Sequence, residues 1–224
     1  MSGAGWSGIS LMDLESTIRA NTVIVTPRVL PDLKLRLVTF EQDWWRADPK
    51  DLEAIGIVDP YWAFCWPGGL ALARYLLDFP ESVRGKRIFD LGSGCGVVAL
   101  AAMKAGAVAA VACDIDSLAL WACAENAMLN GCELSLESRD LIGQPLSGVD
   151  CVLIGDVTYS PELVGRILPW LERLRADGVT ILMADPQRGF LPPDLKPHAI
   201  VRVPTDLGDM PAVASVAVPI YHLR

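Results

Sequence analysis

The stretch from residue 86 to residue 105, KRIFDLGSGCGVVALAAMKA, joins an acid to closely spaced glycines in a pattern suited to ligand binding. Its apolar start predicts a short buried strand carrying Asp90, and a helix is expected to begin near Val97. Three glycines lie between them: Gly92, Gly94 and Gly96. Glycine permits positive φ and leaves no Cβ between backbone and ligand, and the first N–H groups of a helix are free to bind it. We therefore expect a nucleotide-sized cofactor site at the carboxyl end of this strand.

The glycine spacing separates two classes of cofactor. A dinucleotide-binding turn needs G-x-G-x-x-G, but here Val97 stands where the third glycine would be. Asp90 would repel a pyrophosphate and would suit the cationic amino group of a methionine moiety. The D-x-G-x-G-x-G pattern resembles motif I of the class I S-adenosylmethionine-dependent methyltransferases. A plain strand-to-helix turn and a dinucleotide-dependent oxidoreductase are the alternatives.

Two further acids are candidates for the same cofactor. Asp114 ends the apolar run AVAAVACD, 22 residues after Gly92, close to the offset at which an acid on the second strand binds ribose hydroxyls. Asp116 is assigned to the start of the next helix, where a carboxylate complements the helix dipole. Asp140 follows the expected third strand and could accept from an adenine amino group, although a solvated turn explains it equally well.

An aromatic segment, DPYWAFCWPGGLALARY, precedes the glycine stretch. Trp62 and Trp66 are expected to wall one side of the cofactor pocket, and Gly68 and Gly69 would allow close backbone approach. The alternative is an aromatic lid over one edge of the core. Proline and glycine are expected to keep this segment out of the helix that follows, over residues 70–77.

A candidate acceptor site follows the fourth expected strand, CVLI, in the sequence GDVTY. Asp156 should lie beside the glycine turn, because chemistry in a doubly wound sheet sits beyond the carboxyl ends of its strands. Tyr159, three residues later, could face the same opening. Alternatively, Asp156 binds loop backbone and Tyr159 packs on the next helix.

The D-x-x-Y motif, here DVTY, resembles that of the family 16 methyltransferases, which mostly modify protein lysines. PYWAFCWPGGLALARY and ADPQRGFLP are similar to the members that methylate the electron transfer flavoprotein β-subunit, over residues 59–193. The resemblance implies S-adenosylmethionine as methyl donor, lysine side chains of that subunit as acceptor, and Asp156 and Tyr159 as the substrate-positioning pair. A bacterial homologue is expected, since no transit peptide is evident; the alternatives are a ribosomal protein lysine, a small amine, or a catalytically idle binding module.

Alternating strand and helix patterns predict an α/β fold with a doubly wound, mostly parallel sheet. The resemblance implies seven strands in a Rossmann-like arrangement. Residues 1–58 are expected to be an N-terminal extension packed on the core, and residues 59–224 the methyltransferase domain. A proline, Pro169, is expected to kink or break the helix that begins near Pro161.

Composition restricts the partners. The formal net charge of −8 disfavours nucleic acid, and no apolar run is long enough for a membrane span. Six scattered cysteines without C-x-x-C, and only two histidines, predict no metal site and a reducing, cytoplasmic setting. We also expect a monomer.

Overall fold

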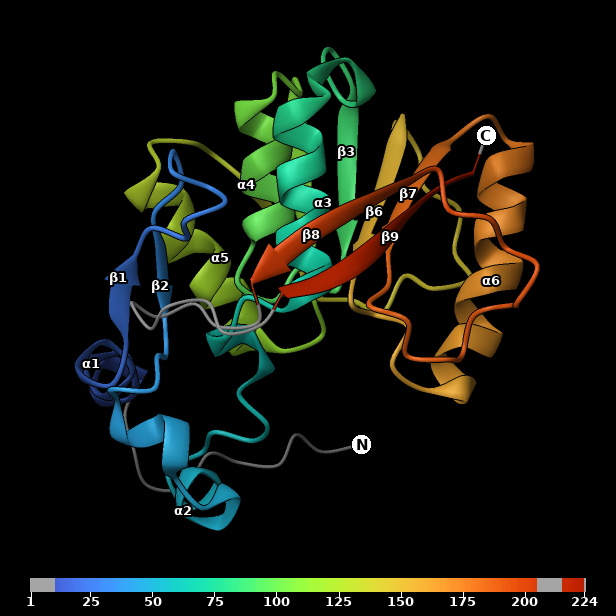
Figure 1. The fold of residues 1–224 in the computed structure, drawn as a ribbon. Coiled ribbons are helices and arrows are strands. Elements are labelled where there is room, and N and C mark those ends of the chain that lie inside the picture. The colour runs from blue at the N-terminus through green and yellow to red at the C-terminus, as the bar shows by residue number, and fades with distance from the viewer. Residues whose placement is uncertain (1–10, 205–214, 224) are drawn as a thin grey trace.

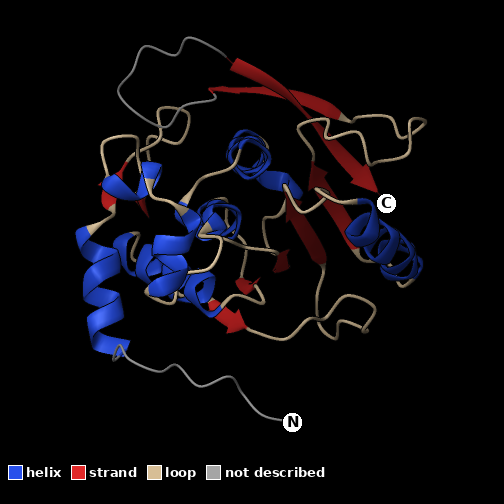
Figure 2. Ribbon diagram, turned by 90° about the horizontal axis from the view of Figure 1, so that it is seen from below, coloured by secondary structure: helices blue, strands red, loops and turns tan. Residues whose placement is uncertain are grey.

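A seven-stranded sheet lies at the centre of our computed structural model, which describes residues 11–204 and 215–223 (Figures 1 and 2). Its strands are β3 (Arg87–Leu91), β4 (Ala109–Cys113), β5 (Ser135–Glu137), β6 (Cys151–Gly155), β7 (Thr180–Ala184), β8 (Ala199–Pro204) and β9 (Ser215–Leu223). The strand order is β5-β4-β3-β6-β7-β9-β8, and β9 alone among these runs antiparallel to its neighbours, β7 and β8. The predicted fold class is confirmed.

Helices cover both faces of this sheet (Figure 1). One face carries α3 (Pro67–Asp78), α4 (Val97–Lys104) and α5 (Ser117–Leu129), and the other carries α6 (Pro161–Ala176). Successive side chains of β3 serve opposite faces, so that Ile88 joins the cluster under α3 and α4, whereas Phe89 packs on Trp170 of α6. Burial on both sides explains why these central strands read as nearly continuous apolar runs.

Two helices differ from the sequence predictions. Helix α3 begins at Pro67, so that Gly68 and Gly69 lie in its first turn instead of before it. Proline fits the first helical position because its missing N–H would have no partner there. The break expected at Pro169 is wrong, since α6 continues to Ala176. The buried apolar face of α6 outweighs the roughly 3 kcal/mol that an interior proline costs.

The N-terminal extension consists of α1 (Leu11–Ala20), the hairpin-like pair β1 (Val23–Val25) and β2 (Leu35–Leu37), and α2 (Pro49–Ala54). A short 3₁₀ helix, Asp43–Arg46, precedes α2, and two more in the described part of the chain, Tyr61–Ala63 and Pro80–Ser82, flank α3. Leu14 and Ile18 of the extension share an apolar cluster with Ala119 and Ala122 of α5. The boundary at residue 58 stays a prediction, because residues on both sides of it belong to the same clusters.

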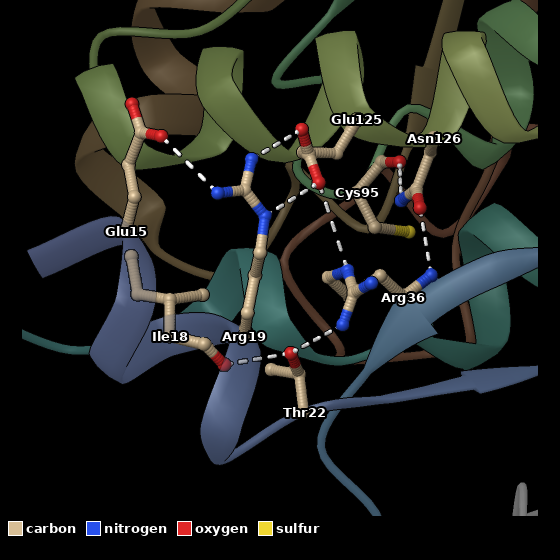
Figure 3. Close-up of polar contacts among 8 residues, drawn as sticks. All are labelled: Glu15, Ile18, Arg19, Thr22, Arg36, Cys95, Glu125 and Asn126. Atoms are coloured by element: carbon tan, nitrogen blue, oxygen red, sulfur yellow. Dashed lines mark hydrogen bonds and ion pairs between the residues drawn. The ribbon is translucent and has the colours of Figure 1, made fainter. Parts of the chain in front are cut away.

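Buried and charged contacts fasten the extension to α5 (Figure 3). The fully buried Asn126 accepts a hydrogen bond from the Arg36 N–H of β2 (2.6 Å) and donates one to the Cys95 carbonyl of the glycine turn (2.8 Å). Beside it, Glu125 pairs with Arg19 of α1 at 2.8 Å. One helix therefore holds the glycine turn on one side and the extension on the other.

We expect Asn126→Ala to lower the free energy of unfolding by about 2–4 kcal/mol, because the buried Cys95 carbonyl and the partly buried Arg36 N–H lose their partner. Urea denaturation monitored by circular dichroism measures this. Gln144→Ala, which alters an exposed amide, is the control and should change stability by less than about 0.5 kcal/mol. Equal stabilities of the two variants would contradict the bridging role of Asn126.

Candidate active site

Acids lie at the carboxyl ends of four neighbouring strands. Asp90 is the second-to-last residue of strand β3, and Asp114, Asp156 and Asp185 directly follow β4, β6 and β7. These strands are parallel, so their carboxyl ends meet at one edge of the sheet. The structure thus brings the predicted donor-side and acceptor-side acids to the same edge.

The glycine turn has the conformation that its sequence predicts. Gly92, Gly94 and Gly96 have φ of +64°, +52° and +78°. A Cβ on Gly92 would meet Val157 Cγ2 at 2.6 Å, whereas the nearest atom to one on Gly94 would be Trp62 Cα at 4.0 Å. The turn is therefore packed at Gly92 and open at Gly94.

Asp90 lies inside the protein, with 1% of its surface exposed. Its Oδ2 accepts a hydrogen bond from the Ala99 N–H in the first turn of α4 (3.0 Å), and burial raises its pKa to about 8. In this structure the carboxyl group ties β3 to α4. Its contact with a methionine amino group stays a prediction.

Asp114 is half-buried at the rim of the glycine turn. Its Oδ2 accepts from the Gly94 N–H (2.9 Å) and its Oδ1 from the Asp116 N–H (3.1 Å). Asp116 caps α5 by accepting from the Leu118 N–H at 2.8 Å, which confirms its predicted place at the helix start. A carboxylate offers about four lone-pair positions, so Asp114 can still accept from ribose hydroxyls.

Asp140 is exposed and forms an ion pair with Arg166 of α6. Its Oδ1 also accepts from the Ile142 N–H at 3.0 Å, and Arg166 holds the pKa of Asp140 below its usual range. These contacts are those of a solvated turn. Recognition of an adenine amino group by Asp140 stays a prediction.

Asp156 is held by main chain on one side and by a cation on the other. Its Oδ2 accepts from the N–H groups of Gly68 and Gly69 (3.1 Å to Gly69), and its Oδ1 accepts from Arg188 Nη2 at 2.6 Å. Burial raises its pKa, while Arg188 acts in the opposite direction. Gly68 and Gly69 do allow a close approach, as the sequence suggested, but the group that approaches them is Asp156.

Tyr159 lies at the mouth of the site, with 58% of its surface exposed. Its pKa is raised by partial burial, and the nearby Asp114 and Tyr61 also contribute. Tyr159 therefore lies near the acid that we assign to the ribose. Its contact with an acceptor stays a prediction.

The two candidate tryptophans occupy different environments. Trp62 is buried against Trp121, its main chain borders Gly94, and its indole N–H has no acceptor among the described residues. Trp66 is 39% exposed, and its ring lies 6.0 Å from the Arg188 guanidinium. Trp62 thus borders the donor side of the opening, and Trp66 the acceptor side.

Three residues of this site were not among the sequence candidates. Thr158 donates to Asp185, which also accepts from the Arg188 N–H at 2.9 Å. The sequence position of Asp185 could have identified it. It directly follows β7, just as Asp114 and Asp156 directly follow β4 and β6. A second signal was Arg188 itself, a cation three residues after Asp185 in the same loop.

The comparisons with known proteins identify the family. A family model for ribosomal protein L11 methyltransferase (PrmA) matches residues 71–155. The electron transfer flavoprotein beta subunit lysine methyltransferase of Xenopus laevis is 41% identical over 175 residues, covering 77% of this chain and 70% of the relative. Its Homo sapiens counterpart is 37% identical over 205 residues, covering 87% and 74%. The chain belongs to this lysine methyltransferase family.

A solved structure agrees on the fold. The Pyrococcus abyssi tRNA (uracil-54, C5)-methyltransferase in complex with S-adenosyl-L-homocysteine superposes with a TM-score of 0.53 at 17% identity, covering 91% of this chain and 44% of that one. The superposition supports the predicted fold, and the relatives above confirm the resemblance read from the sequence.

The residues at the open edge fit the methyl donor of this family. Gly94 leaves space above the turn, and Asp114 retains accepting capacity. The buried indole N–H of Trp62 finds no acceptor within residues 11–204 and 215–223. No three histidine, cysteine or acidic side chains form a metal-binding cluster in the described part of the chain. None of the helices in that part is long and apolar enough to span a membrane.

We expect Gly68→Ala to lower both activity and stability, because its Cβ would lie 2.8 Å from Asp156 Cγ and displace the carboxylate. The loss should be about 1–3 kcal/mol in unfolding free energy, with a fall of roughly 100-fold in kcat/KM. Methyl transfer assays and thermal unfolding measure the two effects.

Gly165→Ala is the matched control, since no atom apart from the neighbouring backbone of α6 lies within 4 Å of the added Cβ. This variant should be more stable by about 0.5–1 kcal/mol and fully active. Full activity of Gly68→Ala would contradict the described position of Asp156.

Proposed function

We propose that this chain transfers methyl groups from S-adenosylmethionine to lysine side chains of the electron transfer flavoprotein β-subunit. The observation that carries the proposal is 37–41% identity to named methyltransferases of that subunit over most of the chain. The position of Asp156 beside the glycine turn supports it, because donor and acceptor groups then converge at one edge of the sheet.

The ribosomal protein L11 methyltransferase model supports only the donor half of the proposal. Its matched range, residues 71–155, includes the glycine turn and Asp114 but ends immediately before Asp156. A ribosomal protein lysine therefore stays the second candidate acceptor, on weaker support than the flavoprotein subunit.

The surface beside the site supports a protein acceptor over a small amine. Trp45, Tyr61 and Trp66 are exposed, and Phe64 links them in a continuous series of ring contacts with centroids 5.5–5.9 Å apart. Residues 41–59 add six exposed acids against two bases: Glu41, Asp43, Asp48, Asp51, Glu53 and Asp59 against Arg46 and Lys50. Exposed aromatic rings with an acidic rim suit a lysine-bearing protein surface.

The chain's task in this reaction is alignment. S-adenosylmethionine supplies, when bound, a methyl group on a positively charged sulfur. The glycine turn and Asp114 bind the nucleoside, and Asp156 and Tyr159 orient the acceptor nitrogen. Such alignment can supply on the order of 7–11 kcal/mol, so no nucleophilic side chain of the enzyme is needed.

The acceptor must also lose a proton. A free lysine has a pKa of about 10.4, so roughly one in a few thousand is neutral at pH 7. An isolated Asp156 carboxylate would favour the charged ammonium and oppose this loss. We therefore assign Asp156 to binding and orientation of the acceptor.

We propose a monomer that acts in the cytoplasm of a bacterium, without nucleic acid or membrane as partner. The net charge of −8 supports an acceptor with basic surface over a phosphate backbone. Five cysteines are buried free thiols that act as small apolar side chains, which suits a reducing setting: Cys65, Cys95, Cys113, Cys123 and Cys151.

Incubation of the purified β-subunit with enzyme and S-adenosylmethionine should add methyl groups to lysines, as detected by mass spectrometry.

Asp156→Ala should lower kcat/KM for this reaction by roughly 100-fold or more, because the acceptor nitrogen loses its orienting carboxylate. Asp78→Ala, which removes an exposed acid on α3, should retain the wild-type rate. An unmodified subunit, in the presence of enzyme that methylates another protein, would contradict the proposed acceptor.

S-adenosylhomocysteine should raise the melting temperature, and NAD should not, because Val97 replaces the third glycine of the dinucleotide turn. Differential scanning fluorimetry with each compound measures this. The reverse result would favour a dinucleotide-dependent oxidoreductase, and no shift with either would favour a binding module.

A further inference from the structure

Arg188 is the cation that contacts the acceptor-side carboxylate. Its Nη2 donates to Asp156 Oδ1 at 2.6 Å, and its guanidinium lies 6.0 Å from the centre of the Trp66 ring. The Arg188 side chain is 31% exposed and that of Asp156 only 7%. This ion pair therefore forms one wall of the acceptor site.

The loop after β7 holds Arg188 in place through its main chain. The Arg188 N–H donates to Asp185 Oδ1 at 2.9 Å, and Asp185, 1% exposed, also accepts from Thr158. The neighbours of Arg188, Gln187 and Gly189, have φ of +62° and +85°. This main-chain geometry directs the Arg188 side chain toward Asp156.

Among the described residues, the other ionisable side chains around this opening are carboxylates, tyrosines and a thiol. From the elements packed there they are Cys65, Asp114, Tyr61, Tyr159 and Asp185. Contact with Cys95 and burial raise the pKa of the Cys65 thiol, and partial burial raises that of Tyr159. Arg188 is thus the group here that opposes a positive charge on an incoming amine.

We propose that Arg188 is a positioning residue that balances the charge of Asp156, so that the acceptor lysine binds beside this pair as a free amine. The extra proton of the lysine passes to bulk water on binding. The nitrogen then keeps its lone pair for the methyl carbon, while the electrons of the broken carbon–sulfur bond stay on sulfur. This inference rests on the proposed function.

The expected effect is large enough to measure. A permanent charge about 5 Å from the amine, at an effective dielectric constant of about 20, shifts an ionisation by about two pH units. Arginine cannot lose its proton in the working range, so its influence is constant with pH.

The first test compares the pH dependence of kcat for wild type, Arg188→Gln and Arg188→Lys, with the β-subunit as substrate. The acidic limb of kcat reports ionisation in the bound complex. Arg188→Gln should move its midpoint upward by about two units, with activity largely recovered at high pH. Arg188→Lys, which keeps the charge, should move it by less than about half a unit.

A matched control removes a different aspartate-paired arginine. Arg87→Gln breaks the exposed pair with Asp150 at the amino end of β3 and should leave the profile unchanged. A uniform loss of kcat at every pH in Arg188→Gln would indicate a merely structural role and overturn the inference.

A second test needs neither turnover nor a folded variant. Calorimetry of β-subunit binding to wild type with S-adenosylhomocysteine, at pH 8 in two buffers of different ionisation enthalpy, counts the protons released. We expect about one proton per complex, because free lysine is charged at this pH. Zero protons released would overturn the inference. A wild type that neither binds nor methylates the subunit would instead refute the proposed function.

Discussion

The hydrogen bonds between the Asp156 carboxylate and the first turn of α3 are the interaction on which the site depends. A carboxylate 8% exposed needs partners, and two main-chain N–H groups at a helix start provide them together with the positive end of the helix dipole. The residue adopts φ of +60°, a conformation that non-glycine residues rarely adopt. This contact joins the segment before β3 to the segment after β6, which lie far apart in sequence.

The sequence predicted the sheet and its helices because local signals agreed with the tertiary structure. Apolar runs of four to eight residues, glycine turns and helix-capping acids all indicate one fold class, and the strands form where these signals place them. The failures came where packing overrode a local rule. Pro169 does not end α6, because Trp170 and Leu171 bury the helix against the sheet.

The candidate site was only partly predictable, for a related reason. Residue types at strand ends indicated Asp114 and Asp156 correctly as members of one edge, since parallel strands bring their carboxyl ends together. The hydrogen-bond partner of each carboxylate could not be predicted from the spacing of residues in the sequence. Asp90 turns toward α4, and Asp156 takes Arg188 as its partner, because those contacts depend on side-chain direction and loop geometry.

The direct attachment of both halves of the site to main chain has a mechanical consequence. The carboxylate of Asp156 is bonded to peptide groups of α3, and that of Asp114 to a peptide group of the glycine turn. Neither carboxylate can change rotamer without breaking its hydrogen bond to a main-chain N–H group. The positions of the two carboxylates are consequently set by the rigid frame, and little reorganisation energy is needed when the charged donor and the neutral amine meet between them.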